Sequence, residues 1–141
     1  MQTELVNFRK EEVRKVWPLA KSFIEEACKT NDGFSAEHIL DFLEKGTMQL
    51  WMAVGENNKV ICVCVTEVRQ YPNYRVCDLR ITTGEDYERW VDYMDEICKW
   101  AKENDCKKME VFARPGWERI LKHKGFVKTH VQIEKNYEFK S

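Results

Sequence analysis

Hydrophobic residues recur along this chain with two periods, and the changes between them divide it into helices and strands. Spacings of three and four residues predict helices over residues 10–28, 36–45, 87–104 and 117–124. Alternating or continuous apolar runs predict strands over residues 5–8, 49–54, 60–69, 75–81 and 107–113, and again from Phe126 onward. The run VICVCV at residues 60–65 indicates a strand buried on both faces, as in the centre of a sheet covered by helices.

Residues with special backbone preferences mark several element ends. Ser35 suits the N-cap of the second helix, Pro115 suits a first helical turn, and Gly125 suits the left-handed position after a last turn. Pro18 lies inside the first predicted helix and predicts a break or kink near its middle. The resulting order is β-α-α-β-β-β-α-β-α-β. Its strand–helix–strand unit predicts that residues 75–81 and 107–113 run parallel.

Length and composition indicate one folded domain over residues 1–141, and the order of elements predicts an α/β fold with a central mixed sheet flanked by helices. Hydrophobic residues make up 43% and charged residues 33% of the chain, too apolar for disorder. No apolar run approaches the roughly 20 residues that cross a bilayer, and the first residues, MQTELVNFRKEEV, contain no apolar stretch of signal-peptide length, so we expect a cytoplasmic protein that does not insert into membranes. The six cysteines lack zinc-site spacing and are interpreted as small buried hydrophobes, so no metal is expected.

Charge is distributed unevenly along the chain. Residues 1–98 carry 12 Lys and Arg against 18 Asp and Glu, whereas residues 99–141 carry 11 against 6. The basic C-terminal third could face a phosphate-bearing ligand or an acidic partner, or it could be a solvated surface of mixed charge. A dedicated nucleic-acid binder would usually be more basic overall, so the sequence argues against that class.

The segment around the last predicted helix carries the most specific motif. Residues 114–126 read RPGWERILKHKGF, which resembles the N-x-x-A-x-x-x-Y-x-x-x-G-F ending of the GNAT family of N-acyltransferases. The order of elements is similar to that family over nearly the whole chain, whereas motif identity is confined to this segment. The strings LWMAV, VTEV and ARPGW also resemble small GNAT-like proteins of tailed bacteriophages, which implies a virion or the host cytoplasm as the location.

The resemblance implies where an acyl-CoA would bind. In the family it sits where two parallel strands splay apart, here residues 75–81 and 107–113. Its pyrophosphate is held by backbone N–H groups of a Q/R-x-x-G-x-G/A loop at a helix N-terminus, where unpaired donors and the helix dipole favour an anion. The implied acetyl-CoA contacts are Ile81, Thr82, Thr83, Gly84, Glu85, Asp86, Arg114 and Trp117. Arg114 could meet a phosphate through its guanidinium fork.

Three positions depart from the family pattern. In the loop only Gly84 fits, because the two acids that follow it would repel a phosphate, or else cap and stabilise the helix. Trp117 stands at the family's small residue and would fill part of the cleft or stack on a planar ligand. Leu121 replaces the tyrosine that commonly protonates the leaving thiolate. His123 could substitute for that acid only if the helix were rotated.

Acyl transfer to an amine also needs a carboxylate or a water chain that removes a proton from the attacking nitrogen. The candidates are Glu67, Asp78 and Glu110, one on each of three predicted strands. Asp78 is the best placed, since it alternates with Arg80 beside the expected splay. The alternative for Asp78 is a structural ion pair with Arg80 or across strands, and Glu110 could merely balance its two flanking lysines.

Three functions therefore stay open at this point. The first is an acyl-CoA-dependent N-acyltransferase with a degenerate pyrophosphate loop, whose partners are acyl-CoA and an amine acceptor. The second is a catalytically inactive module that binds a protein partner, inside a phage particle or in the host. The third is a small-molecule or nucleotide sensor that uses the same cleft. A homo-oligomer is compatible with each of these three functions. Similarity of fold alone establishes neither an activity nor an oligomeric state.

Overall fold

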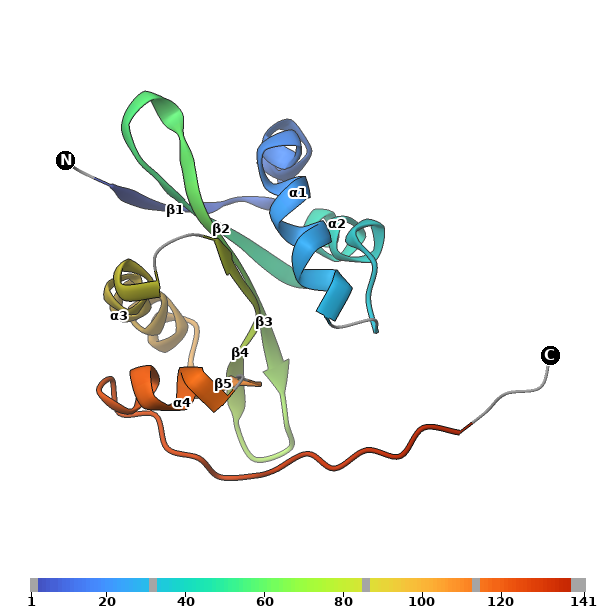
Figure 1. Ribbon diagram of the computed structural model, residues 1–141, viewed down its shortest axis with the longest axis vertical. Coiled ribbons are helices and arrows are strands. Elements are labelled where there is room, and N and C mark those ends of the chain that lie inside the picture. The colour runs from blue at the N-terminus through green and yellow to red at the C-terminus, as the bar shows by residue number, and fades with distance from the viewer. Residues whose placement is uncertain (1–2, 31–32, 85–86, 113–114, 138–141) are drawn as a thin grey trace.

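The computed structural model describes residues 3–30, 33–84, 87–112 and 115–137 (Figure 1). Its elements are, in chain order, β1 (Glu4–Phe8), η1 (Lys10–Glu12), α1 (Val13–Thr30), α2 (Ala36–Lys45), β2 (Met48–Val54), η2 (Glu56–Asn58), β3 (Val60–Gln70), β4 (Arg75–Gly84), α3 (Tyr87–Glu103), β5 (Cys106–Val111) and α4 (Pro115–Lys122).

The strands form one mixed sheet in the order β1-β2-β3-β4-β5. The first four are antiparallel neighbours joined in sequence, and β5 lies parallel to β4. Helix α3 makes the crossover between these last two strands, as a parallel connection requires. The predicted parallel pair is therefore confirmed.

Helices cover both faces of the sheet and bury a separate apolar cluster on each (Figure 1). Helices α1 and α2 pack on one face, where alternate residues of β2 and β3 point toward them: Met48, Leu50, Met52, Val63 and Val65. Helix α3 and Leu121 of α4 pack on the other face, against the residues in between: Trp51, Ala53, Cys62 and Cys64. Residues 62–66 of β3 are consequently all buried, which confirms the interpretation of the VICVCV run.

The ends of the helices follow the predicted signals in most places. The hydroxyl of Ser35 accepts a hydrogen bond from the backbone N–H of His38, and Gly46 ends α2 with a φ of 82°. Helix α4 begins at Pro115. Of the break or kink predicted at Pro18, the break is absent, because α1 continues as one helix through that residue, whereas the kink stays a prediction. Core residues lie on both sides of Pro18 and hold α1 against the sheet despite the missing N–H donor.

The strand predicted from Phe126 onward is also absent, since described residues 126–137 form no strand. Val127, Val131 and Ile133 are instead 77%, 67% and 89% exposed. Alternation of apolar and polar residues specifies which side chains share a face, but it supplies no partner strand for the backbone. Figure 1 shows this segment leaving α4 and extending away from the body of the molecule.

Gly84 ends β4 in close contact with the neighbouring strand. Its φ is +135°, and a Cβ placed on it would lie 2.5 Å from both the Cα of Cys62 and the carbonyl oxygen of Ile61. Both atoms belong to the backbone of β3 and cannot rotate away. The β3–β4 pair therefore requires glycine here, independently of any phosphate.

We expect Gly84→Ala to lower the free energy of unfolding by about 2–4 kcal/mol, through steric overlap and a strained backbone. Gly125→Ala is the matched control, because Gly125 also has a positive φ, +87°, but has no atom within 4 Å of the added Cβ. Its cost should be about 1–2 kcal/mol. Urea denaturation of both variants measures the difference, and equal costs would contradict the proposed overlap with β3.

Candidate active site at the parting of two strands

Strand β4 extends further than β5, its parallel neighbour. It pairs with β5 only as far as Leu79 opposite Val111, whereas it stays paired with β3 up to Gly84 opposite Cys62. No described strand pairs with residues 80–84 on the side that β5 has left. Backbone N–H and C=O groups need hydrogen-bond partners. The arrangement therefore leaves an open strand edge beside the gap between the two strands.

A β-bulge lies at this same point. Val65 and Thr66 of β3 are opposite Ile81 and Leu79, so Arg80 is an extra residue in β4. Such bulges bend a strand and are over-represented near active sites. The guanidinium of Arg80 reaches over the ring of Phe34, at 4.7 Å from its centroid. The bulge thus redirects β4 where β5 ends and turns a cation toward the α1–α2 side of the sheet.

The three candidate bases form one row across the sheet. Asp78 of β4 is directly opposite Glu67 of β3 and also directly opposite Glu110 of β5. Residues opposite one another in a sheet share a face, so the three carboxylates are neighbours. The row lies one residue before the last β4–β5 pair, at the edge of the gap.

Asp78 occupies the centre of this row and is 1% exposed. Its Oδ2 atom accepts a hydrogen bond from Nη1 of Arg80 at 3.4 Å and forms an ion pair with Nη2 of Arg69 at 3.1 Å, so both the predicted Arg80 pair and a cross-strand pair are present. Its Oδ1 atom has no hydrogen-bond partner among the described residues. Burial raises the pKa of Asp78, and the two guanidinium groups offset part of that rise. Glu67 accepts from Nε of Arg69 at 2.9 Å.

Glu110 completes the row from the edge strand. It accepts a weak hydrogen bond from the hydroxyl of Tyr71, at 3.5 Å. The two lysines that flank it are directed at another ring: Lys108 donates to the hydroxyl of Tyr74 at 3.0 Å, and the ammonium of Lys107 lies 5.8 Å from the centroid of that ring. Glu110 is thus half-buried beside Asp78, and it interacts electrostatically with Lys108.

The residues expected at the acyl-CoA loop prove to be largely strand. Thr82, Thr83 and Gly84 extend β4 beyond its predicted end at Ile81, and all four residues are half-buried. Glu85, Asp86 and Arg114, also named from the sequence, lie outside the described residues. The structure thus replaces most of the predicted loop by the open strand edge.

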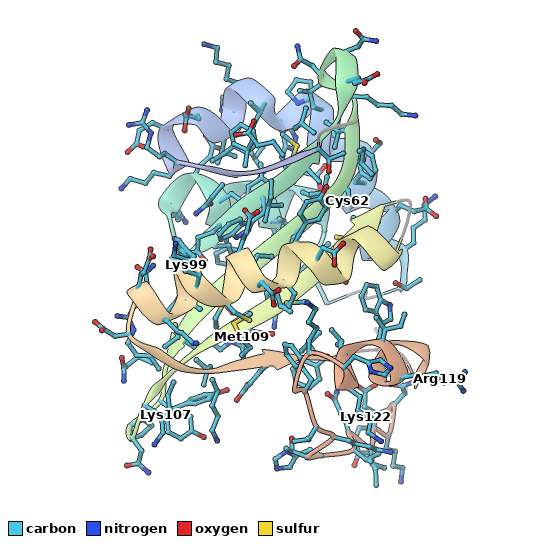
Figure 2. The ribbon with its side chains drawn as sticks, turned by 90° about the vertical axis from the view of Figure 1, so that its left-hand side faces the viewer. Cys62, Lys99, Lys107, Met109, Arg119 and Lys122 are labelled. Carbon is cyan, nitrogen blue, oxygen red and sulfur yellow. The ribbon has the colours of Figure 1, made fainter. Side chains whose placement is uncertain are left out.

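Helix α4 places the remaining candidates on the α3 side of the sheet. Trp117 is half-buried against the apolar cluster there, and Leu121 is 3% exposed within it. His123 follows the helix on an exposed turn. Since Leu121 faces inward, the rotation that would bring His123 into the site is not present. Figure 2 shows Arg119 and Lys122 on the outer side of α4, both exposed.

A surface hollow of about 720 Å³ adjoins the row at the opposite end of β4 from Gly84. Glu67 and Arg69 contribute to its wall, together with Gln49, Arg75 and Trp100. No helix among the described residues is long and apolar enough to cross a bilayer. Within the same residues, no group of three or more His, Cys, Asp and Glu is arranged to hold a metal ion.

Comparison with known proteins rests on structure, because the sequence matches no family profile and no curated protein. A predicted acetyltransferase from Clostridium acetobutylicum, solved with acetyl-CoA, superposes with a TM-score of 0.69 at 16% identity over 96% of each chain. An aminoglycoside acetyltransferase from an uncultured soil metagenomic sample, solved with sisomicin, gives 0.68 at 13% identity, over 96% of this chain and 97% of that one.

Glucosamine-6-phosphate N-acetyltransferase from Arabidopsis thaliana gives 0.68 at 10% identity, over 98% of this chain and 100% of that one. Identities this low establish the fold alone. The mixed five-stranded sheet and its flanking helices are the fold of the GNAT acetyltransferases, as the sequence predicted.

Proposed function

We propose that this protein transfers an acyl group from acyl-CoA to an amine. The observation that carries the proposal is the open edge of β4 at residues 80–84, beside the point where β5 ends. An extended chain with amide groups can add to such an edge as a further strand does. The arm of CoA that ends in the thiol is a chain of this kind. The solved neighbour that contains acetyl-CoA supports the choice of ligand.

The phosphate end of acyl-CoA fits this chain less well. The loop proposed to hold it ends in Glu85 and Asp86, two acids that would repel an anion. Arg119 and Lys122 on α4 are exposed cations on the α3 side of the sheet and could offset part of that repulsion (Figure 2). We therefore propose that binding depends mainly on the acyl-bearing arm, with a smaller contribution from the phosphates.

The row of Glu67, Asp78 and Glu110 provides a group that can accept a proton from the attacking amine. In the proposed reaction the amine nitrogen bonds to the thioester carbonyl carbon, the C–S bond breaks, and CoA leaves as a thiolate that takes a proton from water. The amine loses one proton, and the free Oδ1 of Asp78 is the atom proposed to accept it. Arg69 and Arg80 hold the other oxygen and fix the carboxylate in place.

The same row favours a cationic acceptor. The carboxylates of Glu67 and Asp78 are paired with two guanidinium groups, and Glu110 adds a third carboxylate that interacts electrostatically with Lys108. Glu67 and Glu110 are partly exposed and could meet an ammonium group, whereas Asp78 is buried between them. The hollow beside Glu67 offers room for the rest of the acceptor. We propose a primary amine that carries a second positive charge.

Acetyl-CoA should raise the melting temperature of this protein. At a concentration a hundredfold above its dissociation constant, a ligand selective for the folded state adds about 2.7 kcal/mol, which corresponds to roughly 5–15 °C here. Thermal shift with acetyl-CoA, CoA and adenosine 3′,5′-bisphosphate measures this. The bisphosphate should contribute the smallest shift, since it lacks the arm. No shift with millimolar acetyl-CoA would contradict the proposed function.

Asp78→Asn should lower kcat/KM by about 100-fold or more, because the amide cannot accept the proton. Glu110→Gln, one strand away in the same row, is the matched control and should cost less than tenfold. Release of CoA thiol with a panel of diamines measures both.

The dependence of activity on pH tests whether Asp78 acts in its deprotonated form. A base works when it is deprotonated, so activity should rise with pH through the pKa of Asp78. Burial places that pKa above the usual value of 3.8. If Asp78→Asn still binds acetyl-CoA and retains full activity, Asp78 is not the base.

A second candidate function is a catalytically inactive interaction module, in a phage particle or bound to a host protein. Leu121 favours it, because a buried leucine stands where the family has its proton donor. The thermal-shift panel separates the two candidates, since a module of this kind has no need to bind acyl-CoA.

A further inference from the structure

Exposed apolar side chains gather on two segments of this protein. Of the six large hydrophobic residues that the structure describes as exposed, four lie on residues 126–137 and one is Phe112, directly after β5. Phe112 is 71% exposed, and the four are Val127, Val131, Ile133 and Tyr137. Large apolar groups gathered in this way mark contact surfaces.

Strand β5 ends the sheet, and its outer edge has no strand partner among the described residues. An edge strand presents unpaired N–H and C=O groups to any extended chain that reaches it. Met109 and Val111 point into the cluster beneath α3, as Figure 2 shows for Met109, so Lys108, Glu110 and Phe112 point to the opposite face. The exposed ring of Phe112 therefore lies beside an open backbone edge.

Residues 126–137 have the pattern of a strand. Apolar residues occupy positions 127, 131, 133 and 137, all on one side of an extended chain, whereas Lys128, His130, Gln132 and Glu134 alternate with them. Nothing in the described structure pairs with this backbone. The segment thus has the sequence of a half-buried strand and the exposure of a free chain.

The start of this segment is fixed to its own molecule. The N–H of Phe126 bonds the carbonyl of Leu121 at 3.2 Å, and Phe126 packs against the core cluster. The ammonium of Lys124 reaches Asp95 of α3 at 3.0 Å. In the view of Figure 1 the segment passes below the β3–β4 end of the sheet from this anchor and then extends beyond the body of the molecule. Its direction therefore makes another molecule's edge the accessible partner.

We propose that residues 127–137 add as a sixth strand to the free β5 edge of a second copy of this chain. The exchange is reciprocal, so each copy gives one strand and receives one, which closes a two-fold dimer. The apolar side of the donated strand then covers Phe112 of the receiving copy. This inference does not rest on the proposed acyl transfer, and either can fail alone.

The first test is the mass of the full chain in solution. We expect a dimer by sedimentation equilibrium, and Val131→Glu with Ile133→Glu should raise its dissociation constant roughly a hundredfold or more, because two buried side chains are lost. His130→Glu with Gln132→Glu is the matched control on the opposite side of the segment and should remain dimeric. A native protein that stays monomeric overturns the proposal, as does equal weakening by both double variants.

The second test identifies what the segment contacts. Hydrogen exchange should show protection of the amides of residues 127–137 and of β5 that rises with protein concentration, in step with dimer formation. Protection in a monomeric sample would mean that the segment pairs with its own β5 and would overturn the exchange between copies. A dimer whose tail amides remain unprotected would overturn it equally.

Discussion

The backbone of β4 has to satisfy its hydrogen bonds on two sides, and its two neighbours differ in length. On one side β3 accompanies it to its last residue, Gly84, through a contact too close for any side chain. On the other side β5 stops at Val111. The bulge at Arg80 and the row formed by Glu67, Asp78 and Glu110 both lie beside the point where β5 ends. Among the described residues, no strand pairs with this side of residues 80–84, and their backbone groups there need a partner.

The second constraint is electrostatic. A buried carboxylate costs several kcal/mol unless it is paired, and Asp78 is compensated through only one of its oxygens. A purely structural ion pair would be expected to use both oxygens. The free Oδ1 and the raised pKa are instead what we expect of the proton acceptor proposed above. The buried carboxylate of Asp78, with its free-energy cost of burial, lies within two residues of the open edge of β4. We therefore assign the two features to one site.

The sequence was sufficient for most elements, for the parallel pair and for the Asp78–Arg80 interaction, because these follow from local periodicity and chain order. It could not place Glu67, Asp78 and Glu110 in one row, since register depends on the bulge at Arg80. The prediction of a last strand from Phe126 onward was wrong for a related reason. Alternation in residues 126–137 fixes a face, but whether a strand forms depends on the sheet edge that its backbone meets, and described residues 126–137 pair with none.

Leu121 limits the chemistry that the proposed site can perform. It is buried in the core cluster, so no proton donor stands at that position, and His123 faces solvent beyond the helix. An alkyl thiol has a pKa of about 8.5, low enough for CoA to leave as a thiolate near neutral pH without an acid. An amine, by contrast, cannot complete the transfer while it keeps its extra proton. The proposed reaction therefore depends on a base far more than on an acid, which agrees with carboxylates at the proposed site and a leucine at position 121.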